Sequence, residues 1–294
     1  MNDVPAAKYY HDDPERFRNG LSHTASNTGF SERLIEKDYY CSILLRDFET
    51  LFGQGLVFKG GTCLSKVHIE FFRLSEDLDF GVSVKTDASR ADRRAAIEPA
   101  KQHLPGVAAR LSCFTETVKL TGHNNNKQYN AEFSYRSMVT GELEPVKVEI
   151  SLREEILFTP DPLPAKTMLI DPMTGSPAVS PFAVHALSLI EAYAEKTRAA
   201  LTRREPAIRD FFDIHAAIQK GLVNHSAPEF LELVARKLLA TDDPVNMSDA
   251  RIEALRRQIE TQLKPVLRIA DYMGFTLDQV VELLRIIASS CQRS

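Results

Sequence analysis

The chain has 294 residues, of which 44% are hydrophobic and 26% are charged, the balance of an ordinary soluble globular protein. Its formal net charge of −4 argues against wholesale coating of nucleic acid, although it allows a local basic groove. The four cysteines are scattered without a CxxC spacing, and no apolar run approaches the roughly 18 residues that span a bilayer. These features exclude a disulfide framework, a zinc ribbon and a membrane protein. Without a signal-peptide pattern at the start, we expect a cytoplasmic location.

The first half of the chain, after a weakly patterned stretch over 1–30, alternates between helical and extended patterns. The expected helices are 31–52, 62–72 and 89–104. The expected strands are 56–59, 77–84, 111–120, 129–137 and 145–151. This order predicts an α+β domain over 1–159, with a mixed sheet of about five strands flanked by helices.

A proline-rich stretch follows, with six prolines between residues 160 and 181. Because proline lacks a backbone donor, such a stretch disfavours a central strand or a continuous helix. We therefore interpret 160–180 as a linker. The expected helices beyond it are 181–201, 206–220, 227–239, 248–263 and 276–290. They predict a helical domain over 181–294 that completes a cleft for a nucleotide and an acceptor.

A pair of glycines, Gly60 and Gly61, follows the apolar run over 56–58. Glycines after a strand let the backbone approach a phosphate, and the N–H groups that open the next helix attract anions. Lys66 lies one helical turn after Thr62, so it is expected to stay near this anion cradle and to meet triphosphate oxygens. The alternative is a solvated helix lysine.

Two aspartates, Asp77 and Asp79, alternate with apolar residues, so on a strand both carboxylates project from one face. An isolated pair of this kind is usually the solvated face of an amphipathic strand. Here the pair comes soon after the glycines, and Arg73 and Ser75 stand between. Ser75 could bind a phosphate or cap a turn, and Arg73 could pair with a phosphate or with Asp77. The combination favours a site for a divalent metal and a nucleoside triphosphate.

A third carboxylate is needed to neutralise and orient two cations. The best candidate is Glu149, because Val146, Val148 and Ile150 alternate with it and form the inward face of a strand. Alternation alone leaves open that Glu149 is merely exposed.

The C-terminal half carries a second charged cluster. Asp210 and Asp213 are three residues apart and share a helix face. The basic residues of this cluster are Lys196, Arg203, Arg204 and Arg209. They fit a groove for a nucleotide or an RNA backbone, whereas the alternative is an intrahelical ion-pair surface of little energetic value. The histidines show no metal-ligand spacing.

The motifs are Gly60-Gly61-Thr62-x-Leu64-x-Lys66, then Arg73-x-Ser75-x-Asp77-x-Asp79-Phe80, then Lys196 and Arg209-Asp210-x-x-Asp213. Over about residues 30 to 220 the chain resembles the AbiEii/AbiGii-type nucleotidyltransferase toxins. These include the mycobacterial MenT toxins and belong to the DNA polymerase β-like nucleotidyltransferase superfamily.

The resemblance implies a toxin of a toxin–antitoxin or phage-defence system, with a cognate antitoxin as partner. It implies an enzyme that uses Mg²⁺, or Mn²⁺, and a nucleoside triphosphate (NTP), and that adds nucleotides to the 3′ acceptor end of tRNA, which blocks translation. The implied metal ligands are Asp77, Asp79 and, more loosely, Glu149. The implied nucleotide-binding residues are Gly60, Gly61, Thr62, Lys66, Arg73, Ser75, Lys196 and Asp210.

From these observations we predict a monomeric, metal-dependent nucleotidyltransferase. The predicted catalytic residues are Asp77, Asp79, Glu149, Lys66, Lys196 and Asp210. Two alternatives stay open. The acceptor could be a hydroxyl of a protein or a small molecule, or the chain could be a non-catalytic nucleotide-binding protein that works through protein contacts.

Overall fold

The computed structural model describes residues 9–291. Its centre is a mixed seven-stranded sheet with the order β3-β4-β5-β2-β1-β7-β6. The strands are β1 (Val57–Lys59), β2 (Leu78–Gly81), β3 (Phe114–His123), β4 (Gln128–Arg136), β5 (Leu143–Ser151), β6 (Asp161–Ala165) and β7 (Phe182–Ala186). Strand β2 pairs antiparallel with β1 and parallel with β5, so it lies in the middle of the sheet.

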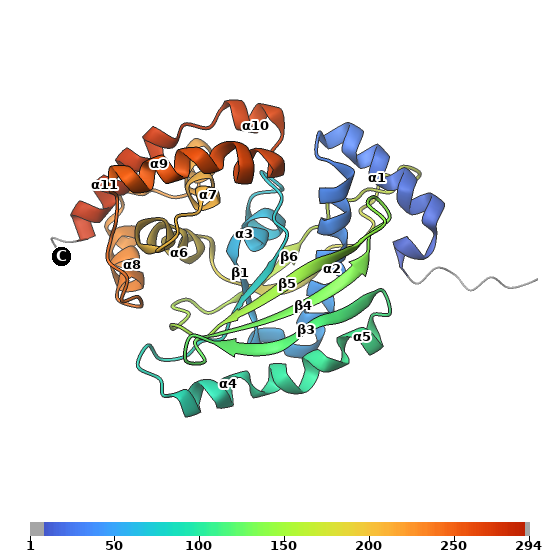
Figure 1. Cartoon of the computed structure of the whole chain (residues 1–294), viewed down its shortest axis with the longest axis horizontal. Helices are drawn as coiled ribbons and strands as arrows, with labels where there is room; N and C mark the ends of the chain where they lie inside the picture. The colour runs from blue at the N-terminus through green and yellow to red at the C-terminus, as the bar shows by residue number, and fades with distance from the viewer. Residues whose placement is uncertain (1–8, 292–294) are drawn as a thin grey trace, which may run out of the picture.

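In Figure 1, α1 and α2 lie at one side of the sheet, α6 to α11 gather at another, and α4 and α5 run along its lower edge in this view. The helices are α1 (Pro14–Thr28), α2 (Glu32–Phe52), α3 (Gly60–Cys63), α4 (Arg90–His103), α5 (Val107–Arg110), α6 (Leu189–Thr202), α7 (Ile208–Gln219), α8 (Pro228–Leu238), α9 (Asp249–Gln258), α10 (Ile269–Met273) and α11 (Leu277–Cys291). Short helical turns are η1 (Tyr10–Asp12), η2 (Gly53–Gly55), η3 (Leu64–His68), η4 (Leu104–Gly106), η5 (Ile259–Leu263) and η6 (Lys264–Val266).

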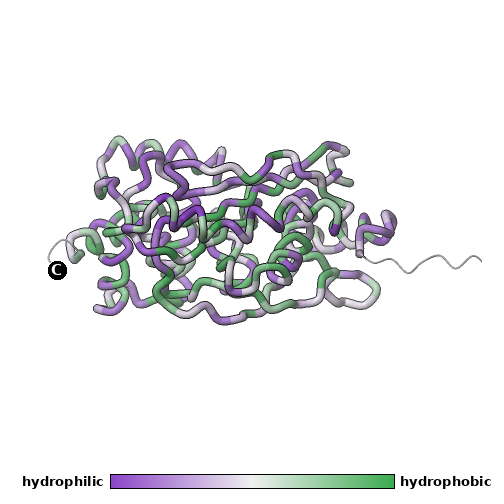
Figure 2. The backbone as a smooth tube through the Cα atoms, turned by 90° about the horizontal axis from the view of Figure 1, so that it is seen from below, coloured by the Kyte–Doolittle hydropathy of each residue, from purple (hydrophilic) through white to green (hydrophobic). Residues whose placement is uncertain are grey.

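The buried residues form two hydrophobic cores, one shared by the sheet with α1, α2, α4 and α5, and one built mainly on the C-terminal helices. In the larger core α2 packs against the sheet together with α4. The second core joins α6, α7, α8 and α11 to the segment around α3, through Val57, Leu64, Ile69 and Phe72. Figure 2 shows hydrophobic and hydrophilic stretches alternating along the backbone, with several hydrophobic stretches through the middle of the molecule. The helical half therefore packs directly on the segment that carries the glycine pair. Among residues 9–291, no helix combines the length and the apolar content that a bilayer crossing requires.

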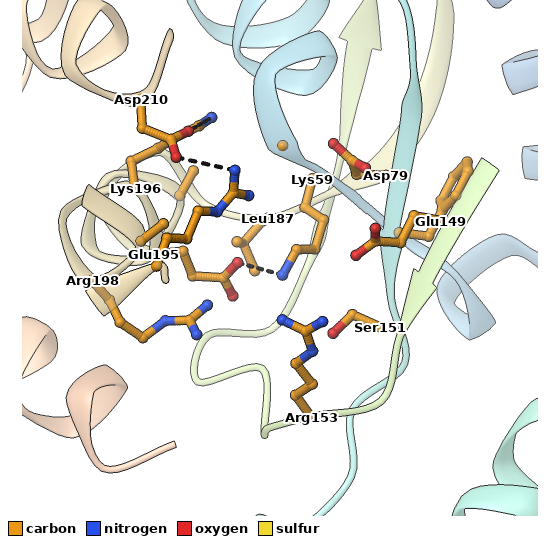
Figure 3. Close-up of a pocket in the computed structure, with 15 residues that line it drawn as sticks. Lys59, Asp79, Glu149, Ser151, Arg153, Leu187, Glu195, Lys196, Arg198 and Asp210 are labelled. Atoms are coloured by element: carbon orange, nitrogen blue, oxygen red, sulfur yellow. Dashed lines mark hydrogen bonds and ion pairs between the residues drawn. The ribbon is translucent and has the colours of Figure 1, made fainter. Parts of the chain in front are cut away.

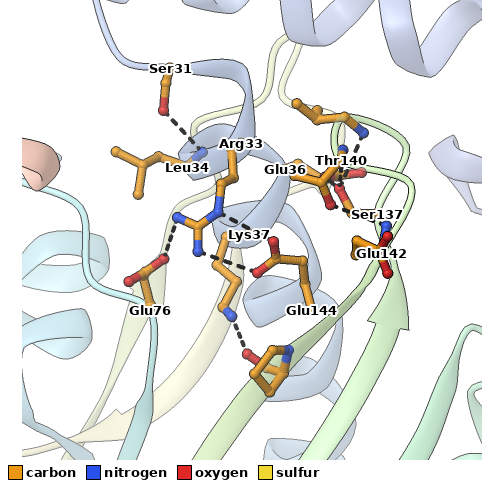
Figure 4. A network of polar contacts seen from close by, with 12 residues as sticks. Ser31, Arg33, Leu34, Glu36, Lys37, Glu76, Ser137, Thr140, Glu142 and Glu144 are labelled. Atoms are coloured by element: carbon orange, nitrogen blue, oxygen red, sulfur yellow. Dashed lines mark hydrogen bonds and ion pairs between the residues drawn. The ribbon is translucent and has the colours of Figure 1, made fainter.

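Polar contacts tie α2 to the strands that carry the predicted site (Figure 4). Arg33 donates to Glu76 at 3.0 Å and to Glu144 at 3.3 Å, and Lys37 donates to the carbonyl oxygen of Pro145. Glu76 directly precedes Asp77, and the other two partners lie in β5. This helix thereby holds the start of β2 and the start of β5 in place.

The α+β class and the mixed sheet flanked by helices are confirmed, but the expected number of about five strands is wrong. Both additional strands lie next to or within the proline-rich stretch. Strand β6 contains Pro162 and Pro164, and it is an edge strand, where a missing N–H donor is tolerated. Strand β7 occupies 182–186, which the sequence analysis assigned to a helix. The division into domains at 160–180 stays a prediction, and its outermost ends, 1–8 and 292–294, lie outside the described residues.

The helical segments are mostly confirmed, with shifts of one or two turns at their ends. Helix α6 starts at Leu189 rather than at 181, because β7 precedes it. The expected helix over 62–72 stops earlier: α3 runs into the π-helical turn η3, and Glu70 and Phe71 adopt positive φ angles of 49° and 55°. The chain over 1–30, which gave no clear pattern, contains the 15-residue helix α1.

Candidate active-site cleft

The predicted carboxylates lie on neighbouring strands at the middle of the sheet. Asp79 in β2 lies in register with Lys59 of β1 on one side and with Glu149 of β5 on the other. Asp77 directly precedes β2, and all three carboxylates line one cavity. The alternation patterns of two separate strands therefore place their acidic faces on the same side of the sheet. The parallel pairing of β2 with β5 brings Glu149 beside Asp79.

The electrostatic environment of Asp77 and Asp79 disfavours their ionised forms. Burial, followed by the nearby charges of Glu149 and Asp77, raises the pKa of Asp79 to about 7. Burial also raises the pKa of Asp77, although Lys147 opposes this shift. The Glu149 carboxylate accepts a hydrogen bond of 2.7 Å from the side chain of Gln128. A cation bound here would favour the ionised forms.

Carboxylate oxygens are the ligands that a hard divalent cation prefers, so the donor types fit Mg²⁺ or Mn²⁺. Within residues 9–291, however, no group of three or more histidine, cysteine, aspartate or glutamate side chains is arranged as a metal-ion site. Asp77, Asp79 and Glu149 line the same cavity and are the residues that would hold the ion. Their side chains would have to move closer together to do so.

The glycine pair has a steric role in addition to the predicted approach of a phosphate. Gly60 has a φ of 77°, and a Cβ atom there would collide with the Asp79 carboxylate. A Cβ atom on Gly61 would collide with the guanidinium group of Arg73. The two glycines thus let β1 and α3 pack closely against Asp79 and Arg73. Thr62 also serves this packing, because its hydroxyl donates a hydrogen bond to the backbone carbonyl oxygen of Asp77.

The structure does not bring Lys66 to the cleft. Its Nζ atom lies 2.6 Å from the Asp38 carboxylate and 2.6 Å from the Ser42 hydroxyl, both on α2. The side chain is fully buried, and it is not among the residues that line the cleft. Helical spacing from Thr62 placed the backbone of Lys66 near the glycines, but the side chain points to the opposite side, where a buried carboxylate neutralises it.

Arg73 and Ser75 line the cavity next to Gly61. Arg73 pairs with Asp213 of α7 rather than with Asp77. Its Nε and Nη2 atoms lie 2.5 and 2.8 Å from the two carboxylate oxygens. This bidentate pair is buried and links the loop before β2 to the helical half.

Lys196 of α6 reaches the same cluster. Its Nζ atom lies 2.7 Å from Asp210 and 2.9 Å from Asp213. Burial alone would lower the pKa of Lys196, but the two carboxylates outweigh it and the pKa is raised. Burial acts against ionisation of Asp210, yet Lys196 and Arg203 prevail and lower its pKa to about 2. The charged cluster is therefore a network of ion pairs between α6 and α7 at the cleft. The alternative, a surface of ion pairs within one helix, is wrong.

These residues surround one continuous cleft between the sheet and helices α6 and α7. Its two halves share Asp79, Glu149, Lys196, Arg203 and Asp210. One half extends toward Gly61, Ser75 and Arg209. The other half is drawn in Figure 3, where Lys59, Arg153 and Arg198 point toward the cavity. The cleft therefore offers carboxylates on the sheet and cations on both walls.

Several lining residues were not predicted as site residues. They are Lys59, Ser151, Arg153, Glu195 and Arg198. Lys59 had a local signal, since it directly precedes the glycine pair, and Glu195 precedes Lys196. Ser151 and Arg153 follow Glu149 at intervals of two residues, which is the spacing of one strand face. Nothing local distinguished Arg198 from a solvated helix arginine.

The architecture and this cleft define an α+β protein of the nucleotidyltransferase type. A family model described as "Nucleotidyl transferase AbiEii toxin, Type IV TA system" matches residues 43–281. The chain therefore belongs to the AbiEii nucleotidyltransferase toxin family of type IV toxin–antitoxin systems. The resemblance noted from the sequence motifs is confirmed.

Solved structures with a similar course of the chain include JHP933 from Helicobacter pylori. That protein is 14% identical, with a TM-score of 0.51, and the match covers 90% of this chain and 94% of the other. A candidate nucleotidyltransferase from H. pylori is 15% identical with a TM-score of 0.43, covering 89% and 91% of the two chains. At these identities the likeness to JHP933 supports the fold alone. No curated protein matches the sequence.

Proposed function

We propose that this protein is a metal-dependent nucleotidyltransferase toxin. It would transfer a nucleoside monophosphate from an NTP to the 3′ acceptor end of tRNA and so inhibit translation. The observation that carries the chemistry is the position of Asp79, between Glu149 and the glycine-bearing segment in a cleft with cationic walls. The acceptor rests on the family resemblance.

In this proposal the backbone at Gly60 and Gly61, together with Ser75 and Lys196, binds the triphosphate. Asp77, Asp79 and Glu149 would hold one or two Mg²⁺ or Mn²⁺ ions. A bound ion would offset negative charge on the reacting phosphate. Lys66 has no part in the proposal, because its amine is bound to Asp38 on the far side of α3.

The transfer forms one bond and breaks one bond. The acceptor hydroxyl oxygen bonds to the α-phosphorus, and the bond from that phosphorus to the bridging oxygen breaks, so that pyrophosphate leaves. Glu149, which also faces the open surface of the sheet beside Asn130 and Lys147, orients the hydroxyl and accepts its proton. Lys196 stabilises the negative charge on the departing pyrophosphate.

The test is incubation of the purified protein with total tRNA and each labelled NTP in turn, in the presence of Mg²⁺ or of a chelator. We expect label on the 3′ end of tRNA with Mg²⁺ and none with the chelator. Label on a protein or a small molecule instead would favour the alternative acceptors. Calorimetry that detects nucleotide binding without any transfer would favour the non-catalytic alternative. The cognate antitoxin, the monomeric state and the cytoplasmic location stay predictions.

A further inference from the structure

We propose that Lys237 of α8 is a positioning residue that fixes two cations of the cleft, Lys59 and Arg198, through the bridging carboxylates Glu195 and Glu154. Lys237 is not among the residues that line the cleft. It lies behind them, in the packing between α6 and α8. The inference rests on the proposed function in one respect only, namely that the cleft binds the polyphosphate of a nucleotide.

Lys237 stands at the centre of a buried group of carboxylates. Its Nζ atom lies 2.6 Å from Glu191, 3.1 Å from Glu195 and 3.2 Å from Glu154. Its side chain is only 2% exposed. Burial of an ammonium group is unfavourable because hydration is lost, and three carboxylates at contact distance offset this cost. In agreement, these carboxylates raise the pKa of Lys237 although burial alone would lower it.

Two of these carboxylates act as bridges, because each uses one oxygen for Lys237 and the other for a cation of the cleft. Glu195 contacts Lys237 through Oε1 and Lys59 through Oε2. Glu154 contacts Lys237 through Oε2 and Arg198 through Oε1, the latter at 3.1 Å. Figure 3 shows Lys59 and Arg198 at the cavity. The orientation of both cations therefore depends on carboxylates whose second oxygen contacts Lys237, through a hydrogen bond at Glu195 and through an ion pair alone at Glu154.

Glu191 anchors the group from the other side. Its two oxygens accept hydrogen bonds from the backbone N–H groups of Leu157 and Phe158, at 2.9 and 3.1 Å. Glu191 pairs with Lys237, and its partners in the described structure include neither Lys59 nor Arg198. The group thus has a fixed end at Glu191 and two adjustable ends at Lys59 and Arg198.

The charges of the group balance as a set. Three cations, Lys59, Arg198 and Lys237, face three carboxylates, Glu154, Glu191 and Glu195. Without Lys237, Glu195 and Glu154 would lose the contact that fixes their second oxygens. Lys59 and Arg198 would then lose the fixed orientation in which they face a bound polyphosphate. Lys59 matters most, since it directly precedes Gly60 and lies in register with Asp79.

The experiment measures binding of inorganic tripolyphosphate by calorimetry to the full chain and to Lys237→Met, Lys237→Arg, Glu195→Gln and Arg236→Met. Arg236→Met is the matched control, because Arg236 is the exposed neighbour of Lys237 on the same helix. We expect Lys237→Met to weaken binding about tenfold, the effect of losing a hydrogen bond to a charged group. Lys237→Arg should keep the affinity within about threefold, because the charge is retained.

The variant Glu195→Gln separates positioning from net charge. It makes the cleft more positive, whereas Lys237→Met makes it more negative. If Lys237 and Glu195 act by holding Lys59 in place, both variants weaken binding. If only the overall charge matters, Glu195→Gln strengthens binding, and the inference is wrong. Because Glu195 is less deeply buried than Lys237, this variant also serves where Lys237→Met does not fold.

The other possible results also support or overturn the role proposed for Lys237. Wild-type affinity in folded Lys237→Met, or equal losses in Arg236→Met, would overturn the inference, as would a wild-type protein that does not bind tripolyphosphate. A protein that shows the expected pattern of binding but transfers no nucleotide would leave this inference intact. In that case the proposed function alone would fail.

Discussion

Lys66 and Lys196 were both expected to bind the triphosphate, and the structure places them in opposite surroundings. Lys66 is fully buried at the interface between α2 and the segment after the glycine pair, where it contacts Asp38 and Ser42. Lys196 lies at the wall of the cleft, 14% exposed, with Asp210 and Asp213 beside it. Both lysines are paired with carboxylates.

The difference lies in what else can reach the amine. Lys66 is enclosed by protein on all sides, where its amine neutralises the buried carboxylate of Asp38. Lys196 shares the cleft with Asp79 and Glu149, so a ligand can reach it. The charge of a lysine near a glycine motif therefore says little about its role. The direction in which its side chain leaves the helix decides whether it acts in stability or in binding.

The largest effect is expected from Asp79→Asn, which changes the cleft and leaves the α2 interface intact. Nucleotide transfer should fall by about a thousandfold or more, the scale of losing a central electrostatic group of an active site. The midpoint of thermal unfolding at pH 7.5 should not fall, because burial of the charged Asp79 is unfavourable and its pKa is raised to about 7. Transfer at the wild-type rate in this variant would refute the assignment of the site.

The converse change is Lys66→Met. It should lower the free energy of unfolding by about 3 to 5 kcal/mol, since the Asp38 carboxylate is left buried without its cation. Transfer by the protein that stays folded should remain within a few-fold of the wild type. Chemical denaturation and an activity assay at low temperature measure both quantities. A large loss of transfer in stably folded Lys66→Met would return Lys66 to the site.

For Lys196→Met we expect the opposite division of effects. Transfer should fall by about a hundredfold, because a charge that stabilises the departing pyrophosphate is lost. The loss of stability should be smaller than for Lys66→Met, since Arg73 still pairs with Asp213 and Arg203 with Asp210. Equal losses of stability in the two variants would show that the two lysines do not differ as proposed.

The smallest effects are expected in the dependence of stability on pH. In the folded state the pKa of Asp79 is raised to about 7, so Asp79 stays protonated up to a higher pH than in the unfolded chain. The contribution of Asp79 to stability therefore falls as the pH rises from about 4 to 7. The pKa of Asp210 is lowered to about 2, so its contribution is present above about pH 4 and is lost toward pH 2.

Denaturation of Asp79→Asn and Asp210→Asn across this range separates the two contributions. The stability of Asp79→Asn relative to the wild type should increase between pH 4 and 7. The deficit of Asp210→Asn should shrink as the pH falls below about 4. Profiles parallel to the wild type in both variants would contradict the assigned surroundings of these carboxylates.

Local sequence patterns determined those features of this protein that depend on neighbouring residues. Alternation placed Asp77 and Asp79 on one face of their strand and Glu149 on one face of a second strand. Helical periodicity located most helices of the C-terminal half. The glycine pair marked the turn after β1, because Gly60 has a positive φ that other residues rarely adopt. The motifs together indicated the family.

The tertiary structure decided which of these features meet. Strand β6 forms in spite of its prolines because it lies at a sheet edge, and edge position is not encoded within the segment itself. The side chain of Lys66 points toward α2 because it pairs there with Asp38 and Ser42, which lie 28 and 24 residues earlier in the chain. Arg73 pairs with Asp213, which lies 140 residues later in the chain. Lys237 pairs with Glu154 and with Glu191, which come from two distant segments. Buried charges require partners at contact distance, and only the folded chain determines which partners come within that distance.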